Sequence, residues 1–167
     1  QKEAREALET RDASEIIRED RGGEVENTYD RLVEFEKEVP ASEARDAVSK
    51  SMQAFSTPAP IAYVAQAFSG MDNRHESQTV FEPTAGVGAL INASPSSKNI
   101  YANELWDPRR KELQKGKFAE VVTGEDIAKL DVPEESFDIV IANPPYVTVK
   151  DENGNIVKWD NPYNPDK

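Results

Sequence analysis

Residues 137–146 read Phe-Asp-Ile-Val-Ile-Ala-Asn-Pro-Pro-Tyr, and this stretch decides the fold. Its apolar half is rich in β-branched residues, which is the pattern of a strand buried on both faces of a parallel sheet. Two consecutive prolines then end the strand, because proline donates no backbone hydrogen bond and disfavours helix in the residue before it. We therefore expect Asn143 at the carboxyl end of a central strand, where open α/β sheets bind their ligands.

The turn after this strand presents groups that suit a flat ring carrying an amine. The side-chain oxygen of Asn143 and the backbone oxygen of Pro144, which Pro145 leaves without a local donor, are hydrogen-bond acceptors. Both oxygens can accept from one exocyclic amine, which leaves the lone pair of that amine more localised for attack. Tyr146 offers a flat apolar face on which the ring can stack.

A strand followed by Asn-Pro-Pro-Tyr resembles the signature of S-adenosylmethionine-dependent amino methyltransferases. Over about residues 55–146 the chain is similar to the DNA adenine-N6 methyltransferase family. The resemblance implies a Rossmann-like class I fold, S-adenosylmethionine as cofactor, and a target adenine flipped out of the duplex. It also implies catalytic roles for Asn143, Pro144, Pro145 and Tyr146.

Residues 79–90 read as a strand, a glycine turn and a helix. Gly86 and Gly88 allow positive φ and a close approach of the backbone to a ligand. The third glycine of a dinucleotide fingerprint is missing, and Glu82 would repel a pyrophosphate. A carboxylate there instead suits a cation, such as the amino group of S-adenosylmethionine. In the resembled family this stretch is the first cofactor motif, and the matching residues are Glu82, Pro83, Ala85, Gly86 and Gly88.

Residues 55–58 read Phe-Ser-Thr-Pro and precede the glycine turn. Taken alone, Thr57 before a proline predicts the N-cap of a helix. We expect that helix to turn four apolar residues inward: Ile61, Val64, Ala65 and Phe68. In the resembled family a Phe/Tyr-x-Thr-Pro element lines the methionine end of the cofactor, which implies that role for Phe55 and Thr57. Its position ahead of the glycine turn implies the gamma-like order of motifs.

A second strand is predicted over residues 99–103, and it ends at Glu104. An acid about twenty residues after the glycine turn is placed to accept both ribose hydroxyls. Leu105 and Trp106 follow it and are candidates to sandwich an adenine ring. A helix is then predicted from residue 107 to about residue 115, with a solvated basic face: Arg109, Arg110, Lys111 and Lys115.

A third strand is predicted over residues 118–123. After it, the resemblance assigns the adenine amino group of the cofactor to Asp126, and Ile127 is placed to pack on the ring. Glu125 is the rival for the role of Asp126. The lone histidine, His75, lies in a polar loop with no base or metal partner nearby, and we assign it no role.

Residues 1–53 predict an acidic helical extension to a partial methyltransferase core at residues 54–150, and residues 151–167 predict a polar loop or tail. In the extension we expect a first helix that is mostly solvated, a second that docks through an apolar stripe, and a third over residues 42–54. The core predicts about four parallel strands, whereas the family sheet has seven. We therefore expect a continuation into further methyltransferase, recognition or helicase regions, as in large phage and plasmid polypeptides.

The chain carries 32 acids against 20 bases, a net charge of −12, whereas nucleic-acid binders usually show a basic surface. We therefore expect contacts with DNA to come from regions outside this chain. There is no cysteine, so thiolate metal sites are excluded, and we expect no metal. No apolar run reaches the length of a membrane span and no signal peptide is evident, which favours a cytoplasmic protein without membrane contact.

Two other functions are compatible with the same residues. Asn-Pro-Pro-Tyr also occurs in methyltransferases that act on a protein glutamine or on RNA. The missing half of the sheet and the acidic charge are compatible with a catalytically silent, methyltransferase-like module used for assembly. A silent module has no physical need for the acids and the asparagine together, which favours the enzyme.

Overall fold

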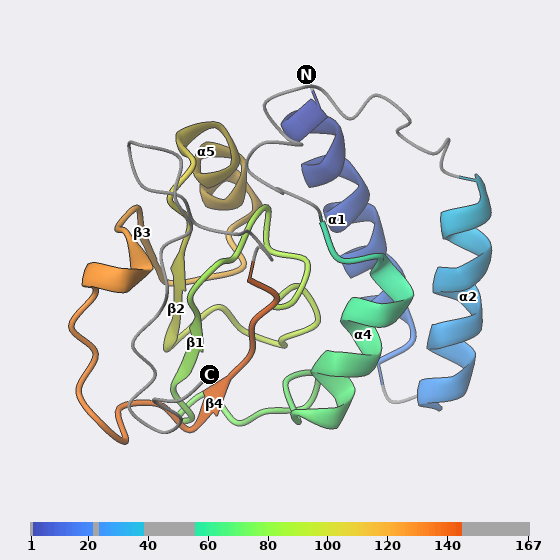
Figure 1. Cartoon of the computed structure of the whole chain (residues 1–167). Helices are drawn as coiled ribbons and strands as arrows, with labels where there is room; N and C mark the ends of the chain where they lie inside the picture. The colour runs from blue at the N-terminus through green and yellow to red at the C-terminus, as the bar shows by residue number, and fades with distance from the viewer. Residues whose placement is uncertain (1, 22–23, 39–55, 145–167) are drawn as a thin grey trace, which may run out of the picture.

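The computed structural model describes residues 2–21, 24–38 and 56–144 (Figure 1). The expected helix over residues 42–54 and the polar tail over residues 151–167 lie outside the described residues, as do Phe55, Pro145 and Tyr146.

Four short parallel strands form an open sheet with the order β3-β2-β1-β4. The strands are β1 (Val80–Glu82), β2 (Ile100–Asn103), β3 (Val121–Thr123) and β4 (Ile139–Val140). This arrangement confirms the predicted α/β class with about four parallel strands, and it is compatible with a Rossmann-like fold. Because the strands are parallel, all of their carboxyl ends lie at one edge of the sheet.

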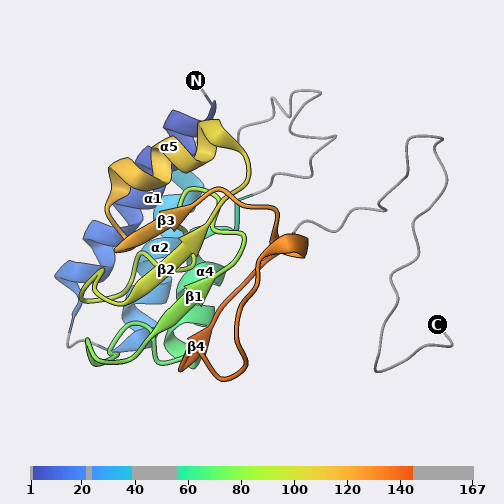
Figure 2. The same cartoon turned by 90° about the vertical axis from the view of Figure 1, so that its left-hand side faces the viewer.

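Among the described residues, four α-helices accompany the sheet: α1 (Lys2–Glu19), α2 (Val25–Glu38), α4 (Ala59–Phe68) and α5 (Asp107–Gly116). They lie together on one side of the sheet (Figure 2). α1 packs against α5 and α2, and α2 packs against α4. No described helix is long and apolar enough to cross a membrane.

The pleat divides the strand residues between two faces of the sheet. Val80 and Ile100 are fully buried and share a core cluster with Leu113 of α5. On the opposite face Phe81 stacks on Phe137, with ring centroids 4.9 Å apart. The helical side therefore carries most of the core, and an aromatic pair covers the other side.

The expectation that the 137–146 strand is buried on both faces is wrong for Val140, which is 62% exposed. β4 is an edge strand that pairs only with β1 among the described strands. Val140 is in register with Phe81, so its side chain points to the side opposite the helices. Ile141, one residue later, is buried in the core.

The expectation that the first helix is mostly solvated is also wrong. α1 buries one side of its length, through residues that are mostly small: Ala7, Thr10, Ala13, Ser14 and Ile17. Small side chains let the helix approach its neighbours closely, but they give a weak apolar pattern in the sequence. The second helix docks as expected, and Leu32 is fully buried beside Ile17 and Tyr63 in a second core cluster.

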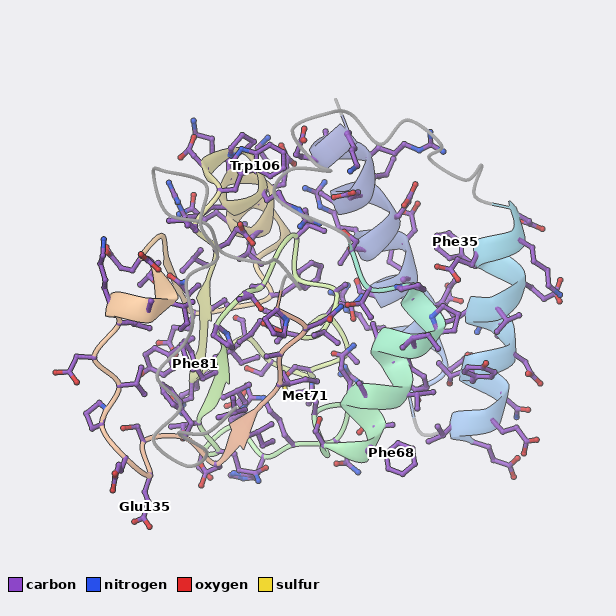
Figure 3. All side chains as sticks on the ribbon, in the orientation of Figure 1. Phe35, Phe68, Met71, Phe81, Trp106 and Glu135 are labelled. Carbon is purple, nitrogen blue, oxygen red and sulfur yellow. The ribbon has the colours of Figure 1, made fainter. Side chains whose placement is uncertain are left out.

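α4 forms where expected, and Ala65 packs against the core as predicted, but two of the residues expected to face inward do not. Ile61 is 56% exposed and Phe68 is 90% exposed, and Figure 3 shows Phe68 pointing away from the body of the molecule. The buried side instead carries Tyr63 and Gln66. Gln66 donates to Ala89 O and Asn92 Oδ1 and accepts from Ala93 N. A side-chain amide with three hydrogen-bond partners is therefore buried where the sequence pattern predicted an apolar side chain.

The helix expected after the glycine turn does not form. From Pro83 to Ser97 the chain makes successive turns, closed by the bonds Gly88 N to Ala85 O at 2.8 Å and Ile91 N to Gly88 O at 3.1 Å. These residues have little helix propensity, because the stretch is rich in serine, asparagine, glycine and proline. The turns leave the loop open along the edge where the strands end.

Candidate functional site

A cavity of about 330 Å³ lies where the carboxyl ends of the four strands meet. Residues that follow each strand line it, together with residues 56 and 57 ahead of α4. The described residues that the sequence predicted for the site and that line it are Thr57, Glu82, Pro83, Ala85, Gly86, Glu104, Leu105, Asp126, Ile127, Asn143 and Pro144. The predicted cofactor residues and the predicted amine-binding residues therefore face one cavity.

Gly88 is the described site residue that does not line the cavity. Its φ is +99°, and a Cβ there would lie 2.8 Å from Phe118 Cδ2 and 3.0 Å from Leu113 Cδ1. The residue is glycine because the turn passes directly over two core side chains. Gly86 has a φ of +57° and lines the cavity itself.

Glu82 ends β1 with its side chain almost wholly buried, at 1% exposure. Its Oε1 atom accepts hydrogen bonds from Thr84 N at 3.0 Å and from Thr84 Oγ1 at 3.3 Å. Its Oε2 atom has no partner among the described residues. Burial raises the pKa of Glu82 to about 7, with the two bonds from Thr84 opposing and the charge of Glu104 adding to the effect. A ligand cation at Oε2 would satisfy this oxygen and favour the charged form.

Glu104 follows β2, and its carboxylate fixes two turns of the cavity wall by accepting hydrogen bonds from their backbone. Its Oε2 atom accepts from Gly86 N at 2.8 Å, and its Oε1 atom accepts from Trp106 N at 2.9 Å. A carboxylate has about four acceptor positions, so about two stay available for hydroxyl groups. The same side chain thus fixes the glycine turn and faces the cavity.

Asn143 is joined to Thr57 across the mouth of the cavity. The Nδ2 atom of Asn143 donates to Thr57 Oγ1 at 3.0 Å, which fixes the amide plane, and Oδ1 accepts from no described residue. Thr57 was expected to cap α4, but α4 begins after Pro58 without a side-chain cap bond. The hydroxyl of Thr57 therefore accepts a hydrogen bond from Asn143 at the cavity and does not cap the helix.

Three further predicted residues form the outer wall. Asp126 caps the 3-10 helix η1 (Ile127–Lys129) by accepting from Ala128 N at 3.1 Å. Leu105 and Ile127 are large apolar side chains that are 56% and 43% exposed, respectively. Glu125 lines the cavity beside Asp126, so the choice between these two acids stays open.

Trp106 also lines the cavity, and its ring lies at the start of α5 (Figure 3). Its backbone N is held by Glu104, so the loop that bears the ring is fixed to the same carboxylate that fixes the glycine turn. The exposed apolar side chains of Leu105 and Ile127 and this indole together give the outer wall a surface suited to a flat ring.

Asn103 was not predicted, and it is buried at the centre of the wall. Its Nδ2 atom donates to Pro83 O at 3.1 Å and to Glu125 O at 2.9 Å. Its Oδ1 atom accepts from Thr123 Oγ1 at 2.8 Å and from Glu125 N at 2.9 Å. One amide therefore joins the ends of β1, β2 and β3. An asparagine that directly precedes a predicted site acid was the available signal.

Arg109 corrects the prediction of a solvated basic face, because it is buried at 5% exposure and lines the cavity. Its Nη2 atom donates to Glu6 Oε2 at 3.0 Å and to Ser56 Oγ at 2.7 Å. Its neighbour Arg110 is half-buried, and Lys111 pairs with Asp107 near the surface. The sequence pattern could not single out Arg109, since its partner lies 103 residues away along the chain.

No protein-family model matches the chain, and neither a curated protein nor a solved structure matches it. The resemblance to adenine methyltransferases therefore stays a prediction from the sequence motifs. Within the described ranges, no group of three histidine, cysteine, aspartate or glutamate residues could hold a metal ion.

Proposed function

We propose that the cavity binds S-adenosylmethionine and that the chain carries part of a DNA adenine-N6 methyltransferase. The observation that supports this most is that the Asn143 amide lines the same cavity as Glu82 and Glu104. Two acids suited to the cofactor and an amide suited to an acceptor amine are thereby within reach of one bound molecule. The cavity volume lies near the lower end of the range for small-molecule sites.

Each part of the cofactor has a chemically matched group in this proposal. The amino group binds the unpartnered Oε2 atom of Glu82, and the ribose hydroxyls bind the free acceptor positions of Glu104. The adenine ring packs against Leu105 and Ile127, with its amine donating to Asp126 or Glu125. A protonated amino group would also supply the counter-ion that the buried carboxylate of Glu82 otherwise lacks.

The proposed transfer is a direct displacement without a covalent enzyme intermediate. The target amine donates to Asn143 Oδ1 and to the backbone oxygen of Pro144, and its nitrogen attacks the methyl carbon. The carbon–sulfur bond breaks, the sulfonium sulfur keeps the electron pair, and the product amine loses a proton to water. The bond from Asn143 Nδ2 to Thr57 holds the acceptor oxygen in place, so positioning is the main contribution.

The DNA itself is proposed to be held by regions outside this chain, because the net charge of −12 opposes binding of a polyanion. The reaction is proposed to take place in the cytoplasm. Methyltransferases acting on RNA or on a protein glutamine would use the same amine-binding corner. The acceptor is therefore the least constrained part of the proposal.

The test is transfer of a labelled methyl group to DNA, RNA and protein in parallel by the methyltransferase of which this chain is proposed to be part, followed by mass spectrometry of the products. We expect N6-methyladenine in DNA. Methylation of RNA or protein alone would contradict the acceptor and keep the reaction class. Binding of the cofactor with no transfer to any acceptor would favour a silent module.

Asn143→Ala is the matched variant for this test. Removing the acceptor oxygen should lower transfer by about 100-fold or more, while S-adenosylmethionine binds with similar affinity, since the amide contacts the amine and not the cofactor. Asn92→Ala, at a buried asparagine of the turns after β1 that does not line the cavity, controls for loss of stability without loss of the acceptor oxygen. A variant at position 143 that transfers methyl groups at the parent rate would exclude the mechanism.

A further inference from the structure

Arg109 is a buried cation at the end of the cavity nearest the glycine turn, and none of the proposed roles uses it. Its guanidinium lies flat over Gly86, where a Cβ would be 3.4 Å from Arg109 Cζ and 3.5 Å from both Nη atoms. These distances are ordinary van der Waals contacts, so the guanidinium packs directly against the turn. The positive φ of Gly86, +57°, is what favours glycine at this position.

The partners of Arg109 come from two other segments of the chain. Glu6 belongs to α1 in the acidic extension, and its side chain is 13% exposed where it pairs with Arg109 at 3.0 Å. Ser56 belongs to the segment that precedes α4, and it also lines the cavity. The ion pair between Glu6 and Arg109 thus connects α1 directly to the cavity wall.

Most N–H donors of the Arg109 guanidinium have no partner among the described residues. Both of its hydrogen bonds use the Nη2 atom, whereas a guanidinium carries five N–H donors. The Nε atom is buried with no partner among the described residues, and no described residue accepts from Nη1. A buried arginine whose donors are mostly unused suits a planar anion that can accept from a fork of donors.

The opposite charge lies in the same cavity. Glu82 presents a buried carboxylate oxygen without a partner, and Arg109 presents a buried guanidinium with free donors. A ligand end that carries an ammonium and a carboxylate together, as an α-amino acid does, would satisfy both. A ligand with only the ammonium would leave the donors of Arg109 unused.

We propose that Arg109 binds the α-carboxylate of the cofactor's amino-acid end, and that Glu6 of α1 positions it for this contact. The inference rests on the proposed function and adds two residues to it. It makes the acidic helical extension a part of the cofactor site. It also predicts that the site discriminates between S-adenosylmethionine and its decarboxylated form.

The experiment is calorimetric titration of the whole chain with two probes, S-adenosylmethionine and decarboxylated S-adenosylmethionine. The second probe keeps the sulfonium, the ribose, the adenine and the amine, and lacks only the carboxylate. We expect Arg109→Gln to weaken S-adenosylmethionine about 10- to 100-fold and to leave the decarboxylated probe within about twofold. Glu6→Gln should weaken S-adenosylmethionine by a smaller factor in the same direction, because it loosens the guanidinium without removing it.

Two further variants keep the result interpretable. Lys115→Gln, an exposed position at the far end of α5, should change neither affinity. The double variant Glu6→Gln/Arg109→Gln removes both buried charges together and so avoids leaving an unpaired carboxylate. If Lys115→Gln and the double variant bind the decarboxylated probe with unchanged affinity, the cavity is folded in both.

The outcomes separate the inference from the proposed function. If the unmodified chain binds both probes equally, or if Arg109→Gln and the double variant weaken both probes by the same factor, the carboxylate contact is wrong while the cofactor site stands. If the unmodified chain binds neither probe, the proposed function fails and this inference fails with it.

Discussion

At the scale of the residue, the cavity depends on polar side chains that are buried with part of their bonding capacity unused. Glu82 and Arg109 both have a buried polar atom without a partner among the described residues. Such groups cost free energy in the unliganded protein, and they persist where a ligand supplies the missing partner. Asn103 is the opposite case, because its amide is fully bonded and serves only to hold the strand ends.

The raised pKa of Glu82 predicts how stability depends on pH. The folded protein binds this proton more tightly than the unfolded chain, since burial moves the pKa from 4.5 to about 7. The free energy of unfolding should therefore fall as pH rises from about 4.5 through about 7, and then level off. The full contribution of this group is on the order of 3 kcal/mol.

Glu82→Gln should remove this part of the pH dependence, because an amide does not titrate. The measurement is chemical denaturation at pH 5 and pH 8, comparing the difference between the two pH values in the variant and the parent. Glu134→Gln, at an exposed acid, is the control and should keep the parent difference. A parent whose stability is flat between these pH values would contradict the burial of a titrating Glu82.

At the scale of the element, the sequence predicted the order and type of most helices and strands but not their inward sides. β2 and α5 form where expected, because the short stretch with Ile100 and Tyr101 and the Asp-Pro start are local signals. Ile61 and Phe68 of α4 were predicted to face inward, whereas Gln66 is buried instead, through hydrogen bonds to residues more than twenty positions away. Arg109 was misassigned for the same reason. Local periodicity carries no information about such distant partners.

Substitution of Gly88 tests whether packing against the core fixes the conformation of the glycine turn. Gly88→Ala places a methyl group within 3.0 Å of two core side chains, at a φ of +99°. We expect a loss of about 2–4 kcal/mol in the free energy of unfolding, from the unfavourable backbone conformation and the steric overlap together. Thermal and chemical denaturation measure it.

Gly70→Ala is the matched control, because Gly70 also has a positive φ, of +74°, but its nearest new neighbour would be Asn73 Oδ1 at 3.9 Å. It should cost only the backbone term of about 1–2 kcal/mol. Equal losses in the two variants would mean that the overlap with Phe118 and Leu113 does not constrain the turn.

At the scale of the whole molecule, the acidic helices and the sheet share one packed body. The second core cluster joins α1, α2 and α4 with Ala93 of the glycine loop. Asn92 Nδ2 also donates to Thr10 O of α1 at 3.0 Å in the interior. The sequence alone predicted α1 and α2 as the first two of three helices in this region. It could not show that they support the cavity, because small residues such as Ala13 mark the contact.

Leu32→Ala tests this connection from the side far from the cavity. Leu32 is fully buried in α2, so truncation should cost about 2–5 kcal/mol. If helices and sheet unfold together, hydrogen exchange in β1 and β2 should accelerate along with exchange in α2. The control is Leu8→Ala, at a residue that is 54% exposed on α1 and should change little. Faster exchange confined to α2 would show that the helical part unfolds on its own.

The central claim is that the cavity where Glu82, Glu104 and Asn143 meet holds S-adenosylmethionine with its ammonium on Glu82. The most direct measurement is calorimetric titration with S-adenosylmethionine in buffers of different ionisation enthalpy, at pH 6 and at pH 8.5. Because the ammonium favours the charged form of a carboxylate whose pKa is about 7, the account predicts one-to-one binding that releases most of a proton at pH 6. At pH 8.5 the account predicts net proton uptake, because Glu82 is already charged and the α-amino group of the ligand must gain a proton to bind as the ammonium. No binding, or binding with the same proton balance at both pH values, would contradict it.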